Sequence, residues 1–228
     1  MERLAREEYD RMMRTLQRQF SRLFTSSAPR TPHKRKAQSL VEFAITLPIL
    51  LLFLSGVVEF GFALNYYLSL LDATRESARF FSNGSPFKDD NTDDMDFYAA
   101  AAAMTRAALD PFVVDSSYVG RRIPLDPNTD DIVVTVYSRS SGEAVAHPSG
   151  GVYRMYGHAT SLFTPARIQA AFGEDSPNAG ILVVEVHYNY HQVMKLPWLA
   201  PFLPDPLMLR AYTIMPLSAA EPVMTPTP

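Results

Sequence analysis

Glu42 and Glu59 are the two acidic residues that border a run of uncharged residues, most of them Leu, Ile, Val or Phe. An ionised carboxylate inside hydrocarbon costs at least about 2.5–3.5 kcal/mol, so a carboxylate there usually has a partner. Glu42 either reaches the membrane surface or pairs with a positive group that comes from proteolytic processing or from a neighbouring subunit. Glu59 either pairs with a partner chain or faces the outer interface. Spacing alone slightly favours the surface position for both residues.

Two acidic loops share the opening spacing of a calcium loop: Asp89, Asn91 and Asp93 in the first, and Asp126, Asn128 and Asp130 in the second. A calcium loop of this type also needs Gly at its sixth position and Glu at its twelfth, and neither loop has them. We therefore expect solvated turns in both places.

His187 and His191 are four residues apart in a stretch of strand-like composition. At about 3.3 Å per residue, two such residues are separated by roughly 13 Å in a strand, which is too far for one metal ion. The chain also lacks a G-x-S-x-G nucleophile motif and a phosphate-binding glycine loop. The sequence therefore predicts no enzyme, no metal, no cofactor and no small-molecule substrate.

One long helix must position the two glutamates. The uncharged run covers residues 43–58, and its apolar character continues to Leu71. A helix needs roughly 20 apolar residues to cross a hydrocarbon core of about 30 Å. The run is apolar on all sides, as expected for a helix without an aqueous face. We predict one membrane-spanning helix that continues beyond the bilayer and ends near residue 84.

A basic segment precedes this helix. Residues 1–36 contain ten Lys and Arg against four Asp and Glu, and Lys34, Arg35 and Lys36 adjoin the apolar run. Positive charge beside a spanning helix marks the cytoplasmic side, so we predict a cytoplasmic N-terminus and an extracytoplasmic C-terminal domain. Residues 1–27 are expected to form a helix, either on the inner leaflet or as a solvated leader. The membrane explains these arginines better than nucleic acid does.

The remaining chain mixes helical and strand patterns. A helix is predicted from about residue 93 to residue 109, with Thr92 or Asp93 as its N-cap. A short helix is expected near residues 165–172. Strand composition marks three runs, residues 132–137, 181–190 and 207–215. The predicted fold class is α+β, a long N-terminal transmembrane helix packed on a small, mostly antiparallel sheet.

Four parts follow from these patterns. We predict a basic cytoplasmic leader (1–36), a transmembrane and amphipathic long helix (37–84), an extracytoplasmic α+β domain (85–220) and a disordered tail (221–228). The chain has no cysteine, so no disulfide stabilises the domain.

Several short motifs follow one another along the helix: AQSLVEFA at 37–44, Leu47-Pro48, EFG at 59–61 and ATRESAR at 73–79. Together they resemble the TadE-like family, the minor pilins or pseudopilins of tight-adherence pilus systems. The sequence from residue 183 to residue 215, with its proline-rich apolar middle, resembles the family's closing pair of strands more loosely. The resemblance implies a pilin-like fold.

The resemblance also implies a processing step. A prepilin-type peptidase would cut between Ala37 and Gln38, which makes Glu42 the fifth residue of the mature chain. The new amino group at Gln38 would carry a positive charge beside the Glu42 carboxylates of neighbouring subunits. Glu42 and Glu59 would then set the register of assembly. Ala37 departs from the family pattern, which usually has Gly there.

The function that the resemblance implies is structural. The chain would help to initiate or assemble a type IV-like pilus for adhesion or secretion in a bacterial cell membrane. Its partners would be the membrane, the major pilin, the assembly platform and a prepilin-type peptidase, and not nucleic acid. The alternative is an uncleaved single-pass membrane protein whose outer domain binds a partner or ligand. The sequence leaves open the stoichiometry and the choice between fibre and base.

Overall fold

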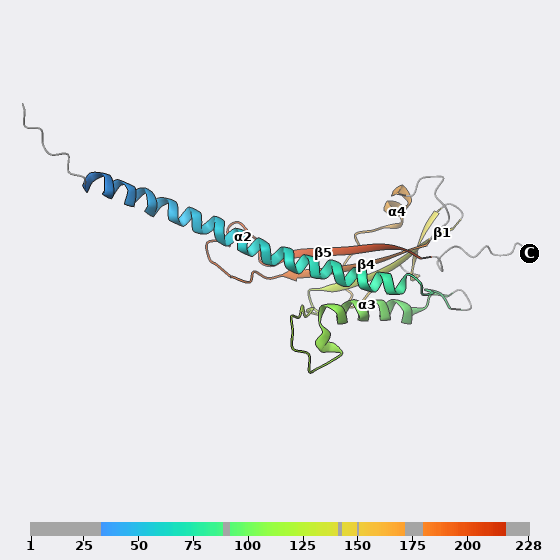
Figure 1. Cartoon of the computed structure of the whole chain (residues 1–228). Helices are drawn as coiled ribbons and strands as arrows, with labels where there is room; N and C mark the ends of the chain where they lie inside the picture. Colours follow the sequence, from blue (N-terminus) through green and yellow to red (C-terminus); the bar gives the residue numbers. More distant parts are fainter. Residues whose placement is uncertain (1–32, 89–91, 141–142, 150, 172–179, 218–228) are drawn as a thin grey trace, which may run out of the picture. The chain divides into compact units, whose positions relative to one another are not determined.

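The computed structural model describes residues 33–88, 92–140, 143–149, 151–171 and 180–217 (Figure 1). The chain forms two compact units, Met1–Leu51 and Leu52–Pro228, which are described separately. The predicted leader helix of residues 1–27 and the predicted tail of residues 221–228 lie outside the described residues. The predicted division into four parts stays a prediction.

The longest element is helix α2 (His33–Phe81), which contains Pro48. Its residues 33–51 are all that is described of the first unit. Most large apolar side chains of residues 38–51 are exposed, among them Leu40, Phe43 and Ile45. Among the described residues, α2 is the one helix that is long and apolar enough to cross a membrane. Such a surface needs lipid or other helices around it.

In the second unit, one face of α2 packs on the domain. The buried positions of α2 are Ser55, Glu59, Leu70, Ala73, Thr74, Ser77 and Ala78. Steps of three and four residues keep these positions on one side of a helix. Most of the side chains are small, so the helix backbone can lie close to its neighbours. Thr74 Oγ1 lies 2.8 Å from Thr213 Oγ1, and Ser77 Oγ donates to the Ala101 carbonyl at 2.8 Å.

The sheet is antiparallel and has the order β2-β1-β4-β5, with the short β3 paired to β1. The strands are β1 (Asp131–Ser140), β2 (Glu143–His147), β3 (Tyr153–Arg154), β4 (Gly180–Tyr190) and β5 (Leu207–Leu217). β4 pairs on both sides, and its residues 182–187 are buried without a break. A strand that is covered on both faces is rich in apolar, β-branched residues, as β4 is with its three valines at 183, 184 and 186.

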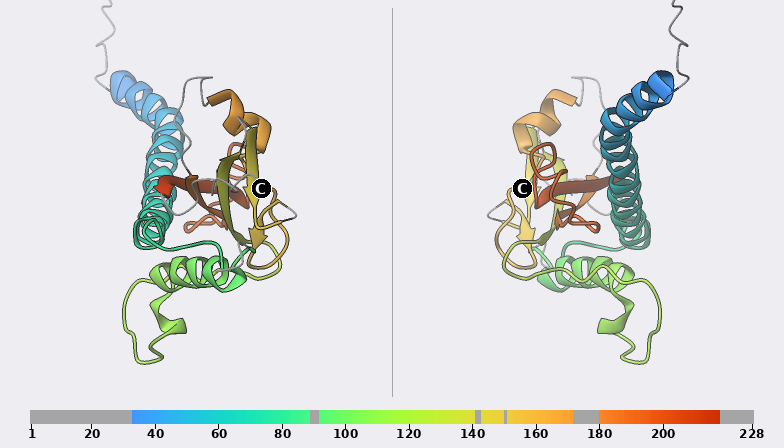
Figure 2. Two further views of the ribbon diagram at one scale, coloured as in Figure 1. Left: turned by 90° about the vertical axis from the view of Figure 1, so that its right-hand side faces the viewer. Right: turned by 90° about the vertical axis from the view of Figure 1, so that its left-hand side faces the viewer.

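Helices cover both faces of the sheet (Figures 1 and 2). On one face, α2 and α3 (Met95–Leu109) pack with Val134 and Val184 in the main core. On the other face, Ile168 of α4 (Pro165–Ala171) packs with Tyr137 and Val183. A 3₁₀ turn, η1 (Pro111–Val113), follows α3.

The predicted α+β fold class is confirmed, with a long apolar helix on a small antiparallel sheet. The three predicted strands and the short α4 helix are present, and the long helix occupies His33–Phe81 instead of residues 37–84. The N-cap of α3 was predicted wrongly, because Asp94 accepts the hydrogen bond from the Asp96 amide. Strands β2 and β3 were not predicted.

Candidate functional site

The predicted processing site lies inside α2, in the first unit. Lys34, Arg35 and Lys36 occupy the first turn of the helix, which has no acidic residue. The N-terminal end of a helix carries partial positive charge, so cations are unfavourable in its first turn. Cleavage between Ala37 and Gln38 stays a prediction.

Glu42 is exposed one helical turn after Gln38. The side-chain amide of Gln38 donates a 3.0 Å hydrogen bond to Oε1 of Glu42, as residues four apart on a helix can. The Glu42 carboxylate therefore faces the turn that would become the amino terminus after cleavage. Exposure also leaves the carboxylate accessible to a group from outside the chain.

Glu59 lies in a different setting, because its side chain is only 2% exposed. Its Oε1 atom accepts hydrogen bonds from the Tyr190 hydroxyl at 2.5 Å and from the Val193 amide at 2.8 Å. Its Oε2 atom accepts one from the Met194 amide at 3.0 Å. Three donors to one buried carboxylate form a charge-assisted set of bonds. These bonds join α2 to the end of β4 and to the loop that follows it.

The hydrogen-bond donors that the structure describes for Glu59 all belong to the same chain. From the sequence, Glu59 was expected either to pair with a partner chain or to face the outer interface. Burial raises the pKa of Tyr190, and the adjacent Glu59 carboxylate adds to this effect. The phenol thus stays protonated and remains a donor. A role of Glu59 between subunits stays a prediction.

Aromatic contacts add to the interface between α2 and the end of β4. The Tyr66 ring lies 5.2 Å from the Tyr190 ring, edge to face, and is stacked at 5.9 Å on the Tyr188 ring. The Arg121 guanidinium lies 4.8 Å from the centre of the Tyr66 ring and donates a hydrogen bond to Asn65. Sequence spacing alone gave no signal of these contacts, because they join distant segments.

The acidic loops contain structural carboxylates. Oδ2 of Asp130 accepts a hydrogen bond from the Asp126 amide, and Oδ1 accepts one from the Asn189 amide, both at 2.8 Å. Asp93 accepts from the Ser149 amide and hydroxyl at 2.5 and 2.6 Å. These bonds hold the loops. The prediction of solvated turns was wrong for Asp130, because this residue is only 2% exposed and its carboxylate is used for bonds within the domain. Asp89 and Asn91 lie outside the described residues.

The two histidines have different neighbours. His187 lies 3.5 Å from Glu185, and His191 contacts Asp205 at 2.9 Å. Within the described ranges, no group of three or more His, Cys, Asp or Glu side chains is arranged to hold a metal ion.

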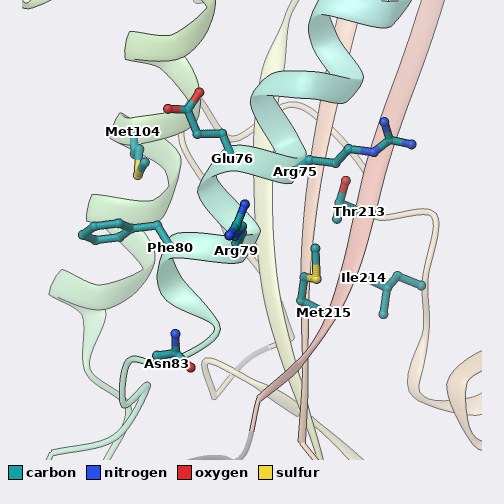
Figure 3. A pocket seen from close by; sticks show the side chains of 9 residues that line it. All are labelled: Arg75, Glu76, Arg79, Phe80, Asn83, Met104, Thr213, Ile214 and Met215. Carbon is teal, nitrogen blue, oxygen red and sulfur yellow. The ribbon is translucent and has the colours of Figure 1, made fainter.

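An open pocket lies where α2, α3 and β5 meet (Figure 3). Its charged residues are Arg75, Glu76 and Arg79, and all three are exposed. Charges of both signs in an open, exposed hollow select no particular ligand, so we assign none.

The comparisons with known proteins point to the long helix. Residues 37–79 match the family described as TadE-like protein, which confirms the resemblance in that segment. No curated protein and no solved structure was found to match the chain. The family is a structural component of pili and not an enzyme family. The TadE-like segment and the membrane-capable helix together fit a membrane protein associated with a tight-adherence pilus.

Proposed function

We propose that this chain is a minor pilin or pseudopilin that helps to initiate or assemble a tight-adherence pilus. The observation that carries the proposal is that two features coincide in α2. The TadE-like match covers residues 37–79, and the apolar segment that is able to span a membrane covers Gln38–Phe81. The segment that resembles the family is therefore also the segment that would enter the membrane.

In this proposal a prepilin-type peptidase cuts between Ala37 and Gln38. The positive amino group of Gln38 then pairs with Glu42 carboxylates of neighbouring subunits, and this pairing sets the register. The exposure of Glu42 and its position one turn from Gln38 support this role. Apolar burial alone does not drive helices together inside lipid, so a charge pair and close packing must supply the attraction.

The part of α2 from Leu52 onward belongs to the same compact unit as the globular domain. Glu59 binds the segment after β4, and Thr74 and Ser77 bind β5 and α3. We place the basic residues Lys34, Arg35 and Lys36 in the cytoplasm and the domain outside it, because positive flanks stay inside. The proposed partners are the major pilin, the assembly platform and the peptidase.

The test is intact mass and N-terminal sequencing of the protein purified from membranes of its native host. A chain that begins at Gln38, with or without a methylated amine, supports the proposal. A parallel strain that lacks the prepilin peptidase is the control and should retain Met1. A chain that begins at Met1 in both strains would favour the alternative, an uncleaved membrane-anchored protein that binds a partner through its outer domain.

A further inference from the structure

The loop between β4 and β5 runs beside α2 (Figure 1). Apolar side chains of this loop line a groove with the helix. The apolar part of the loop, the nine residues from Leu196 to Pro204, includes no charged side chain. Phe202 is 68% exposed and Trp198 is 47% exposed. A monomeric soluble protein rarely presents so many large apolar side chains together.

The apolar surface of the loop is continuous with that of α2. Phe53, Val57 and Phe60 of the helix line one shallow groove with Leu199 and Phe202 of the loop. The three helix residues are about two-thirds exposed. Whatever surrounds this part of the helix therefore also meets the loop.

The position of the loop along α2 can be counted in residues. A span that begins at Gln38 and crosses about 30 Å uses roughly 20 residues and so ends near Val57. Trp198 is fixed at this level, because its indole N–H donates to Ser55 Oγ at 3.2 Å. The loop therefore lies where the apolar span reaches its outer boundary.

The backbone of the loop is suited to a site with little water. Three of its nine residues, Pro197, Pro201 and Pro204, have no N–H group. Three more, Leu199, Phe202 and Leu203, donate their N–H groups to carbonyls within the loop. A backbone N–H group without an acceptor is energetically unfavourable in lipid. Because this loop has few such groups, its insertion into lipid carries only a small free-energy penalty.

Charged residues flank the apolar loop. Lys195 is exposed directly before it, and Asp205 follows it and binds His191. Tryptophan and flanking charges at the two sides of an apolar segment are typical of the boundary between lipid and water.

We propose that residues 196–204 form a membrane-inserted loop, which lies in the lipid leaflet next to the globular domain. Lipid fits better than a protein partner, because the loop shares its surface with the helix that the membrane must surround. The loop would fix the depth and rotation of α2 in the bilayer. The inference requires the membrane span of α2 but not the pilus role.

The chain contains one tryptophan, Trp198, so its own fluorescence tests the proposal. The full-length protein is placed in vesicles of phosphatidylcholine and phosphatidylglycerol, with bromine on the acyl chains either near the headgroup or near the bilayer centre. We expect shallow bromine to remove roughly half of the Trp198 emission and deep bromine to remove less. Phe202→Trp with Trp198→Phe should behave alike and reports from the more exposed ring.

Two further tryptophan positions, each in the Trp198→Phe background, calibrate the depth. Leu50→Trp lies in the apolar run and should be quenched most by deep bromine. Phe80→Trp is 20 residues beyond Phe60, or roughly 30 Å further along the helix, and its wild-type side chain is 67% exposed. It should respond to aqueous acrylamide and not to bromine.

Three outcomes would overturn the inference. Trp198 and Phe202→Trp could respond to acrylamide as Phe80→Trp does, which would place the loop in water. Both could be shielded from acrylamide and bromine until the protein is diluted in lipid, which would mean that another copy covers the loop. If bromine failed to quench Leu50→Trp, α2 would not span the membrane. That result would contradict the proposed function as well.

Discussion

The carboxylate of Glu59 accepts a 2.5 Å hydrogen bond from the hydroxyl of Tyr190, 131 positions further along the chain. Two backbone amides of the following loop donate to the same carboxylate. This cluster joins α2 to the sheet and also holds the start of the loop that we place in lipid. The Glu59 carboxylate is thus hydrogen-bonded by donors within the domain.

Replacement of Glu59 should weaken the contact between α2 and residues 190–194. In Glu59→Gln the amide NH₂ cannot accept, so at least one of the Val193 and Met194 amides loses its acceptor. A buried donor without a partner costs about 1–3 kcal/mol. Hydrogen exchange measured by mass spectrometry should become faster in residues 190–195. Tyr190→Phe should cost about 1 kcal/mol, because it removes one bond and leaves both amides satisfied.

Glu76→Gln is the matched control for Glu59→Gln. Glu76 is an exposed residue of the same helix, so its replacement should leave exchange in residues 190–195 unchanged. Equal exchange in Glu59→Gln and in Glu76→Gln would refute the role assigned to the buried cluster.

In contrast to Glu59→Gln, replacement of Glu42 should affect assembly and not the stability of the domain. Its side chain is exposed and accepts a hydrogen bond from Gln38 of the same helix, so Glu42→Gln should leave the folding of the domain intact. If Glu42 pairs with the amino group of a neighbouring subunit, the same change should reduce the amount of pilus sheared from cells of the native host. Protein level and N-terminal processing, measured by immunoblot and mass spectrometry, should stay at wild-type values. Normal piliation with Glu42→Gln would contradict the assembly role.

Sequence patterns predicted the elements with strong periodicity and missed the contacts between them. The long apolar run of α2 and the β-branched run of β4 carry their own signals, so both elements were expected. Strand β2 has only five residues, so its pattern is too short to recognise. The Glu59–Tyr190 bond could not be predicted, because it depends on how the end of β4 meets the helix. The spacing of residues along the chain does not show how β4 packs against α2.

Buried carboxylates recur as loop anchors in this cysteine-free chain. Asp131 accepts hydrogen bonds from the amides of Tyr156, His158 and Ala159, at 2.8–2.9 Å. Glu185 accepts from the Leu162 amide at 2.8 Å and from the Ser161 hydroxyl. Each carboxylate satisfies backbone donors in a long connection that lacks a regular ladder. These carboxylates therefore restrain the loops of the domain without disulfides.

Asp131→Asn should destabilise the domain strongly. The Asp131 side chain is fully buried, and both of its oxygens accept backbone N–H groups. An asparagine NH₂ would face a donor instead of bonding it, at a cost of about 2–4 kcal/mol. The midpoint of thermal unfolding, followed by circular dichroism in detergent, should fall. Asp72→Asn, which changes an exposed aspartate of α2, is the control and should leave the midpoint unchanged. A midpoint for Asp131→Asn equal to that of the control would show that the loop does not depend on this anchor.

Stability should also decline in acid through Asp110. Hydrogen bonds from Arg122, at 2.6 Å and 3.0 Å, hold the pKa of the Asp110 carboxyl below its usual range. A carboxyl whose pKa is lowered by folding adds stability above its unfolded value of about 3.9, and this contribution disappears as the pH falls through the folded pKa. Asp110→Asn should therefore lower the unfolding midpoint at pH 7, and the difference from wild type should shrink below about pH 4. Thermal unfolding between neutral and acidic pH measures this difference, with Asp72→Asn again as the control. A difference that stays constant across the whole range would show that the ionised carboxylate of Asp110 contributes nothing through Arg122.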